Sequence, residues 1–332
     1  MSKVVVFNQM GGADVLNIQN IQDIQTPAPL ANDVQIRVRA IGINRAEIMY
    51  RTGQYIYQPN FPARLGYEAS GIVEAVGDNV HEFAPGDSVS VIPAFSFHEY
   101  GMYGEIVNAP AHAVVKHPEN LSFAEAAASW MMYVTAFGAL VEYANIGPGD
   151  NVLINAASSS VGLAAIQIAN MVGATPIAMT RTHEKRDALL QLGAAEVIAS
   201  QEQDLVTEIN RITDGKGTRV VFDPVGGPGV AKIAQVMPAG GLFFQYGSLD
   251  GRDLSIPVIE ILGRHLTFRG YELFEITTDA EKLARAKRFI FEGLQSGQLN
   301  PLIDKTFAFD DIVKAHQYME ANGQVGKIVV TL

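Results

Sequence analysis

The sequence contains no cysteine among its 332 residues. Disulfide bonds, thiolate nucleophiles and thiolate-ligated metal sites are therefore excluded, and cysteine usage says nothing about the redox compartment. Positive charge is also scarce, because 24 Lys and Arg stand against 35 Asp and Glu and leave a formal net charge of −11. Proteins that hold a nucleic acid backbone need clustered positive charge, so we expect no nucleic acid partner.

A long hydrophobic run is missing as well. The strongest candidate, residues 126–141, falls short of the ~20 apolar residues of a membrane span and contains Ser129, Thr135 and Gly138. We interpret it as a buried helix. Residues 4–7 are apolar, but this segment is too short for the core of a signal peptide and polar residues follow it. We therefore expect a cytoplasmic protein without a membrane partner.

The composition is typical of a soluble α/β protein, with 48% hydrophobic and 18% charged residues, and the length suggests two domains. The first part of the chain alternates short apolar segments with Gly and Pro turns, which predicts a compact, barrel-like β domain. Its expected strands are residues 3–8, 33–41, 70–76, 88–92 and 103–108. Helical patterns at 122–130 and 131–143 follow, so we place the domain boundary near residues 121–131.

The most informative stretch begins at residue 151. Residues 152–154 form an apolar run that fits a buried parallel strand, and Val161, Ala165, Ile168 and Val172 then recur at helical spacing. Between them lies a turn of small residues. A strand, a tight turn and a helix in this order aim free N–H groups and the positive end of the helix dipole at the turn, which favours phosphate binding.

This turn departs from the glycine-rich fingerprint of dinucleotide-binding units. The three fingerprint positions are Ala157, Ser159 and Gly162, so only the third is glycine. Ala and Ser are the next smallest residues, and serines at a helix start can cap the helix and donate to phosphate. The alternative is a capped helix after a strand that holds no ligand.

The sequence downstream of the turn favours the nucleotide interpretation. Strand and helix patterns alternate there, which predicts a doubly wound parallel sheet that binds its ligand at the carboxyl ends of the strands. The expected strands are 175–179, 196–198, 219–223 and 242–246, and the expected helices are 184–192, 204–213 and 230–237. After residue 270 we expect helices at 279–296 and 310–322 and strands at 305–309 and 327–332. We expect the last strand to return to the N-terminal domain, which gives domains of 1–125 with 271–332, and of 126–270.

The end of the second strand narrows the choice of nucleotide. An NAD-binding unit places an acid there against the ribose 2′-hydroxyl, whereas an NADP-binding unit offers a cation to the 2′-phosphate. Here the strand ends in Thr180 and Arg181, with Lys185 close behind and no acid at the strand end. We therefore favour NADPH, with Arg181 and Lys185 as phosphate partners. The alternative is that both are solvated surface charges.

Several segments in the correct order resemble the medium-chain dehydrogenase/reductase superfamily, and within it the zinc-free NADPH:quinone oxidoreductases. They are residues 42–47, 51–55, 65–73, 85–87, 157–162 and 326–327. The resemblance spans nearly the whole chain. It implies an α/β fold with a GroES-like β-barrel catalytic domain and a Rossmann domain, NADPH as cofactor, and a homodimer.

One departure concerns metal. Zinc alcohol dehydrogenases of this superfamily ligate zinc through Cys and through the His of a Gly-His-Glu segment, which here is Gly66, Tyr67 and Glu68. The other local candidates, His98, Glu99 and His112, have no recognisable ligand spacing. We therefore predict no catalytic metal.

The resemblance also suggests site residues. It places Asn44 and Tyr55 nearest the oxygen of the acceptor, and Thr135 beside the nicotinamide. The remaining cofactor-contacting positions are Ser158, Ser159, Ser160, Val161, Gly162, Gly227, Tyr246, Gly247, Ser248 and Gly270. Asn44 could instead cap the helix that follows it, and Tyr55 could be a loop aromatic.

Three functions are compatible with this sequence. The leading hypothesis is metal-free hydride transfer from NADPH to a small-molecule quinone. The first alternative is reduction of the C=C bond of an α,β-unsaturated ketone or aldehyde, because the same nicotinamide geometry serves both conjugated acceptors. The second is a nucleotide-binding structural protein without activity. The aromatic residues that could line an acceptor pocket or simply pack the core are Tyr57, Phe95, Phe97, Tyr133, Tyr271 and Phe274.

Overall fold

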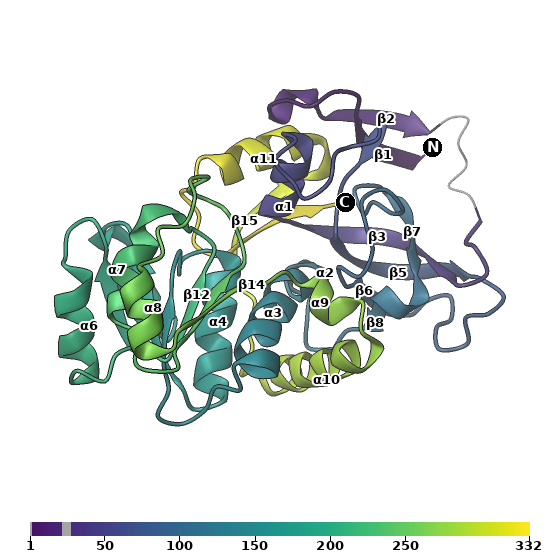
Figure 1. Ribbon diagram of the computed structural model, residues 1–332. Coiled ribbons are helices and arrows are strands. Elements are labelled where there is room, and N and C mark those ends of the chain that lie inside the picture. Colours follow the sequence, from purple (N-terminus) through teal and green to yellow (C-terminus); the bar gives the residue numbers. More distant parts are fainter. Residues whose placement is uncertain (1, 22–27) are drawn as a thin grey trace. The chain divides into compact units, whose positions relative to one another are not determined.

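The computed structural model describes residues 2–21 and 28–332, and the chain divides into two compact units. Unit 1 consists of Met1–Met131 and Pro301–Leu332, and unit 2 is Met132–Asn300. Figure 1 shows both as ribbons coloured along the sequence. Within the described residues, no helix combines the length and the apolar character that a membrane crossing needs.

Unit 1 is built on two sheets. Its strands are β1 (Ser2–Phe7), β2 (Asn17–Ile21), β3 (Asp33–Ile43), β4 (Ala63–Arg64), β5 (Glu68–Val76), β6 (Ser88–Val91), β7 (Ile106–Pro110), β8 (Val114–Lys116), β15 (Ile303–Ala308) and β16 (Lys327–Thr331). Its helices are α1 (Arg45–Arg51), α2 (Phe123–Ala127) and α11 (Ile312–Glu320). The small sheet has the order β2-β1-β4, and the large one β15-β16-β3-β5-β6-β8 with β7 also paired to β3.

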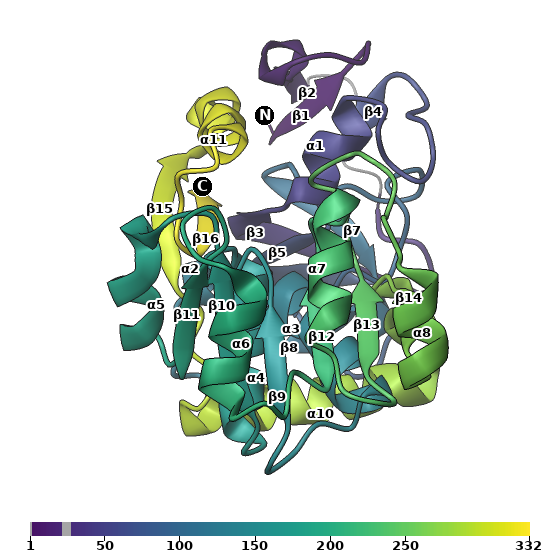
Figure 2. The same cartoon turned by 60° about the vertical axis from the view of Figure 1, so that its left-hand side comes forward.

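The prediction that the final strand joins the N-terminal domain is confirmed. Strand β16 pairs antiparallel with β3, with Val330 opposite Ile41, so the last strand of the chain lies in the large sheet of the N-terminal domain. Figure 2 shows β15 and β16 beside β3. Val329 and Val330 are fully buried there, which explains why this segment is apolar.

Unit 2 contains a six-stranded sheet in the order β11-β10-β9-β12-β13-β14, with parallel pairing throughout. Its strands are β9 (Asn151–Ile154), β10 (Thr175–Thr180), β11 (Glu196–Ala199), β12 (Val220–Asp223), β13 (Leu242–Gln245) and β14 (Thr267–Gly270). Its helices are α4 (Ser160–Met171), α5 (Arg186–Gln191), α6 (Leu205–Thr213), α7 (Val230–Gln235), α8 (Val258–Arg264), α9 (Phe274–Thr277) and α10 (Ala280–Ser296). Helix α3 (Trp130–Phe137) begins in unit 1 and continues into unit 2. The doubly wound sheet predicted from the alternating pattern is thus confirmed, and Figure 2 shows the order of its strands.

The central strands of this sheet are buried on both faces. Helices α6, α7 and α8 lie on one face and α4 lies on the other (Figure 1). Leu153 and Val221 are inaccessible to solvent and belong to a core formed with side chains of α6 and α7. A strand covered on both faces must be continuously apolar, which is the pattern that residues 152–154 show.

The structure differs from the predicted domain boundary at residue 270. Helix α10 groups with unit 2, so this unit extends to Asn300. Its Gly293 lies against Met171 at the end of α4, and Phe289 contacts Phe137 with ring centroids 5.2 Å apart. The long amphipathic helix expected at 279–296 therefore exists, but its apolar face packs within unit 2 and not on the N-terminal domain. Helix α8 and strand β14 were not anticipated.

Candidate functional site

The first candidate site lies in unit 2, where β9 runs into α4. Strand β9 sits between β10 and β12, so the chain winds away from it in both directions. In doubly wound sheets this reversal leaves a crevice at the carboxyl ends of the strands, and ligands bind there. Because α4 spans twelve residues, its N-terminus also directs a full helix dipole at this point.

Small residues are required in the turn between β9 and α4. Ser159 caps the helix: its Oγ accepts the N–H of Gly162 at 3.0 Å, which confirms the capping role expected for these serines. A Cβ at Gly162 would lie 2.6 Å from the carbonyl oxygen of Ala157. The third glycine of the fingerprint is thus needed for close packing, whereas the positions of Ala157 and Ser159 tolerate a side chain.

A buried aspartate that was not predicted from the sequence stabilises this turn through hydrogen bonds. The Asp223 carboxylate at the end of β12 accepts the N–H groups of Val225 and Gly226 at 2.5 and 3.1 Å. It also accepts the side-chain amide of Asn155, the first residue after β9, at 3.1 Å. Burial raises the pKa of Asp223. The sequence pattern that could have identified Asp223 is an Asp at the end of a predicted strand, followed directly by a Pro and then by two glycines.

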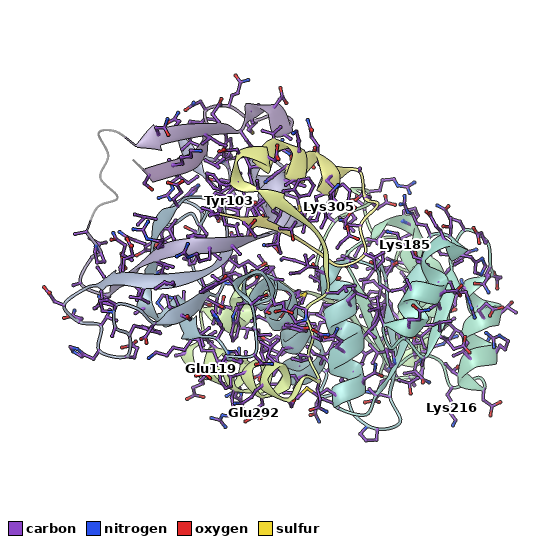
Figure 3. The ribbon with its side chains drawn as sticks, turned by 180° about the vertical axis from the view of Figure 1, so that it is seen from behind. Tyr103, Glu119, Lys185, Lys216, Glu292 and Lys305 are labelled. Atoms are coloured by element: carbon purple, nitrogen blue, oxygen red, sulfur yellow. The ribbon has the colours of Figure 1, made fainter. Side chains whose placement is uncertain are left out.

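The cations proposed for the 2′-phosphate follow β10. Arg181 directly follows Thr180, the last residue of that strand; its side chain is exposed and forms no ion pair with any described residue. Lys185 (Figure 3) is half-buried, and its Nζ lies 3.4 Å from the Oγ of Ser158 in the turn after β9. Lys185 therefore places a positive charge at the same turn as the positive N-terminal end of the α4 dipole.

The other predicted cofactor residues lie mostly at the same edge of the sheet. Ser160 and Val161 begin α4, Gly227 follows β12, residues 246–248 follow β13, and Gly270 ends β14. Gly227 has a φ of +70°. Thr135 is different, because it lies buried within α3 rather than at a strand end. Its neighbour Val134 accepts a hydrogen bond from Tyr271, the residue after β14, at 3.4 Å.

Tyr246 supplies a test of whether this edge suits a nucleotide. Its ring stacks on Phe222 with centroids 3.9 Å apart, and its buried hydroxyl faces the side chain of Ser159 without a hydrogen bond of good geometry among the described residues. Burial and the charge of Asp223 raise the pKa of this hydroxyl. A buried donor without a partner is costly, so a polar ligand group here would satisfy it. The residues present fit a dinucleotide.

The second candidate site lies in unit 1 around Asn44. Asn44 is the N-cap residue of α1 and forms a capping box with Glu47, whose Oε2 accepts the N–H of Asn44 at 2.5 Å. Its side-chain amide also donates to Gly42 at 3.2 Å and to Glu68 at 3.1 Å. These contacts are all buried, and they fix the side chain of Asn44 firmly.

A buried ion pair adjoins Asn44. The ammonium group of Lys327, at the start of β16, pairs with the carboxylate of Glu68, and both side chains are inaccessible to solvent. Lys327 also donates to Oδ1 of Asn44 at 2.5 Å, and Glu68 accepts the N–H of Met131 at 2.9 Å. Residues 326–327 belong to the segments that resemble the family, but the sequence alone indicates no role for them.

Two further titratable groups extend this cluster. Burial raises the pKa of Glu47 to about 7. Burial, aided by Arg51, lowers the pKa of His316 to about 3. The hydroxyl of Tyr103 (Figure 3) lies between them, 3.0 Å from Glu47 and 3.1 Å from His316. Tyr103 donates to the carboxylate, so its oxygen accepts the Nε2–H of His316. The lowered pKa keeps His316 neutral, and its Nδ1 has no partner among the described residues.

Tyr55 lies on the loop after α1 and is half-buried. Its hydroxyl is 3.0 Å from that of Tyr67, and the Tyr57 hydroxyl is 2.9 Å from the same oxygen. Tyr55 therefore belongs to a group of phenol hydroxyls rather than standing alone. Of the aromatic residues whose role was open, Phe95, Phe97, Tyr133 and Tyr271 are core residues, while Tyr57 and Phe274 keep partial exposure.

The three candidate metal ligands, His98, Glu99 and His112, each form hydrogen bonds with other protein groups. His98 contacts the carbonyl of Gln58 at 2.8 Å, and His112 contacts that of Ala94 at 3.1 Å. Glu99 accepts the N–H and hydroxyl of Ser96. Across residues 2–21 and 28–332, no three His, Asp or Glu side chains are grouped so that they could hold a metal ion.

Comparison with known proteins places the chain in a family. The alcohol dehydrogenase GroES-like domain family matches residues 30–119, and the zinc-binding dehydrogenase family matches residues 160–288. The human quinone oxidoreductase is 31% identical over 333 residues, which cover 100% of this chain and 98% of that protein. The chain belongs to the zinc-free quinone oxidoreductase family of medium-chain dehydrogenases/reductases.

Solved structures agree with this assignment. The Escherichia coli quinone oxidoreductase, crystallised with NADPH, superposes with a TM-score of 0.89 at 29% identity and covers 99% of this chain and 100% of its own. The CurK enoyl reductase reaches a TM-score of 0.88 at 27% identity, with 99% coverage of both chains. As a member of the quinone oxidoreductase family the protein is an oxidoreductase, and the GroES-like and Rossmann domains implied by the sequence are confirmed.

Proposed function

We propose that this protein transfers a hydride from NADPH to a small-molecule quinone without a metal. NADPH, when bound, supplies the hydride, and the protein supplies binding, orientation and charge stabilisation. The nucleotide would lie along the carboxyl edge of the sheet of unit 2, with its pyrophosphate at the N-terminus of α4. The observation that carries this assignment is the turn after β9, where the Ser159 cap, Gly162 and the Lys185 ammonium meet.

Discrimination between NADPH and NADH would rest on Lys185 and Arg181. A 2′-phosphate carries about two negative charges and gains from charge-assisted hydrogen bonds, which are roughly twice as strong as neutral ones. Lys185 is already held near the turn, whereas Arg181 is exposed and would have to order on binding. We therefore assign the larger share of the preference to Lys185.

Tyr55 would be the catalytic residue of unit 1. Hydride addition leaves negative charge on the acceptor oxygen, and a phenol hydroxyl can stabilise it by donating a hydrogen bond or its proton. The amide hydrogens of Asn44, which the family resemblance places near the acceptor oxygen, are directed at Gly42, Glu47 and Glu68. We propose that Asn44 is a positioning residue that holds the start of α1, the helix that leads to the Tyr55 loop.

The decisive experiment is an NADPH oxidation assay with a panel of quinones and a panel of enones. Quinone reduction that withstands removal of trace metal supports the proposal. Oxidation of NADPH with enones alone supports the first alternative, for which the similarity to an enoyl reductase at a TM-score of 0.88 is the specific argument. Tight NADPH binding without turnover on either panel would instead indicate the structural alternative.

We further propose that the protein forms a homodimer through unit 2. Strand β14 is the edge of the six-stranded sheet, and an edge strand can pair with its own copy about a two-fold axis. Helix α8 precedes it and exposes Val258, Ile259 and Leu262 at 64, 79 and 66%. Sedimentation velocity should show a dimer for the wild type and a monomer for Ile259→Glu. A wild-type monomer at micromolar concentration would refute this interface.

A further inference from the structure

Three tyrosine hydroxyls form a connected series in unit 1. The hydroxyls of Tyr55 and Tyr57 lie 3.0 and 2.9 Å from that of Tyr67. At the far end, the backbone N–H of Phe97 donates to the Tyr57 hydroxyl at 3.0 Å. We call Tyr55, Tyr67 and Tyr57 the tyrosine chain, with Tyr67 in its centre.

Packing fixes the central member of the tyrosine chain. The ring of Tyr67 is inaccessible to solvent and stacks on Phe97 with centroids 3.8 Å apart and planes 27° apart. Its backbone N–H donates to Glu47 at 3.2 Å. The preceding residue, Gly66, has a φ of +105°, and a Cβ there would lie 2.6 Å from the ring of Tyr103. The position of the Tyr67 hydroxyl is therefore set by the fold and does not depend on solvent.

The hydroxyls of Tyr67 and Tyr57 stay protonated under ordinary conditions. Burial raises the pKa of Tyr67 and, to a lesser degree, that of Tyr57. A neutral phenol has one hydrogen to donate and two lone pairs that accept. Tyr67 can therefore accept a proton from one neighbour while it donates its own to the other, without an ionised resting state.

We propose that Tyr67 is a positioning residue that orients the Tyr55 hydroxyl and reprotonates it during reduction of the acceptor. This inference rests on the proposed function. The O–H bond of Tyr55 breaks as an O–H bond forms on the reduced acceptor, the proton of Tyr67 moves to Tyr55, and that of Tyr57 moves to Tyr67. Water then restores the proton of Tyr57, which is partly exposed. The hydride supplies both electrons, so the oxidation state of the tyrosines does not change.

The geometry also predicts which acceptors depend on the tyrosine chain. Hydroquinone anions are weak bases, so the reduced product of a quinone can leave the active site before it collects its proton. An enolate is a stronger base and gains more from a donor that is immediately reprotonated. The tyrosine chain should therefore matter more for enone acceptors than for quinones.

The test compares Tyr67→Phe with Tyr100→Phe in the full-length protein. Tyr67→Phe keeps the ring that stacks on Phe97 and removes only the hydroxyl. Tyr100 is a matched control in the same unit, because its hydroxyl donates to Asp33 at 2.9 Å and lies outside the tyrosine chain. For Tyr67→Phe we expect kcat to fall with both kinds of acceptor, about tenfold with an enone and less with a quinone, at unchanged KM and NADPH affinity, since one proton-transfer partner is lost. Tyr100→Phe should match the wild type.

A proton inventory separates relay from packing. In mixtures of H2O and D2O, several protons moving together give a curved dependence of kcat on the deuterium fraction, and a single proton gives a straight line. We expect a curve for the wild type and a line for Tyr67→Phe. In the nucleotide-free protein, 13C-labelled tyrosine spectra should show the Tyr55 and Tyr57 ring carbons shifting in Tyr67→Phe and staying in place in Tyr100→Phe.

The failures can be told apart. Turnover and a proton inventory that stay the same in Tyr67→Phe would overturn the inference and leave the proposed function standing. If the wild-type protein oxidised NADPH with none of the quinones and none of the enones tested, the proposed function would be refuted, and the inference with it.

Discussion

Replacing Lys327 by methionine tests the buried ion pair of unit 1. Met has nearly the length of Lys, so the packing of β16 is kept while the charge is lost. Glu68 would then be a buried carboxylate without a cation, and Oδ1 of Asn44 would lose its donor. Removing one partner of a buried pair typically costs about 3–5 kcal/mol, so we expect a loss of unfolding free energy of that size.

A double variant shows whether charge is the cause. In Lys327→Met with Glu68→Gln both charges of the ion pair are removed, and the Gln oxygen can still accept the N–H of Met131. We expect the double variant to be about 2 kcal/mol more stable than Lys327→Met alone. Lys305 (Figure 3), an exposed lysine on the neighbouring strand β15 whose ammonium lies over the rings of Phe307 and Tyr318, provides the control: Lys305→Met should change the unfolding free energy by no more than about 1 kcal/mol.

Urea unfolding followed by tryptophan fluorescence is the appropriate assay. Trp130 is the single tryptophan of the sequence, and it is 1% exposed within unit 1, so its emission reports on this unit. A loss below about 1 kcal/mol in Lys327→Met would refute the reasoning from an uncompensated charge. A double variant no more stable than the single one would show that the loss comes from packing.

Four further predictions concern the two candidate sites. Lys185→Ala should weaken NADPH binding by roughly 3 kcal/mol and Arg181→Ala by roughly 1.5 kcal/mol, and both should leave NADH nearly unchanged in fluorescence titrations; equal losses for both nucleotides would contradict the assignment. Tyr55→Phe should lower kcat with quinones about tenfold and with enones more, whereas full activity would remove its catalytic role. Exhaustive chelation should leave activity intact, and a stoichiometric metal in elemental analysis would overturn the metal-free mechanism. The pKa of His316 is lowered to about 3 in the fold, so its contribution to stability is present above its ordinary pKa and is lost as pH falls, at about 1.4 kcal/mol per pH unit between 6.5 and 3. His316→Gln should flatten this fall in urea unfolding measured at pH 7 and pH 5, relative to the exposed control His81→Gln, and equal slopes for the two variants would disprove it.

The nucleotide-type domain was readable from the sequence because its signals are local. A continuous apolar run, a small-residue turn and helical spacing all lie within residues 151–174, and β9 and α4 appear where expected. Ser159 was expected to cap α4, and it does. Buried parallel strands and capped helices can be recognised in a sequence because the residue types that they require lie close together along the chain.

Helix α8 and strand β14 left no such mark. The apolar residues Val258, Ile259 and Leu262 of α8 remain exposed in the single chain, so they do not follow the pattern of a helix packed on its own core. Strand β14 has only four residues and lies at the edge of the sheet. Elements whose apolar face is not used within the chain cannot be recognised from the periodicity that intrachain packing produces.

The polar cluster of unit 1 could not be predicted for a different reason. Lys327 and Asn44 lie 283 positions apart, and only the pairing of β16 with β3 brings them together. The sequence indicated that the last strand would return, but not the register that sets Lys327 on Glu68. Tyr67 was considered only as a residue in place of a zinc ligand, so its contact with Tyr55 and Tyr57 was missed.

The return of β16 to β3 has a consequence for how the protein is made. Strand β16 lies inside the large sheet of unit 1, between β15 and β3, and it follows all of unit 2 in the sequence. During synthesis, unit 2 is complete and can fold while unit 1 still lacks an interior strand and Glu68 still lacks its cation. Unit 1 therefore waits through the translation of unit 2 with its sheet open. A chain whose synthesis ends after residue 300 would contain a complete unit 2 joined to a unit 1 that lacks β15 and β16. Such an incomplete unit is a substrate for chaperones and proteases.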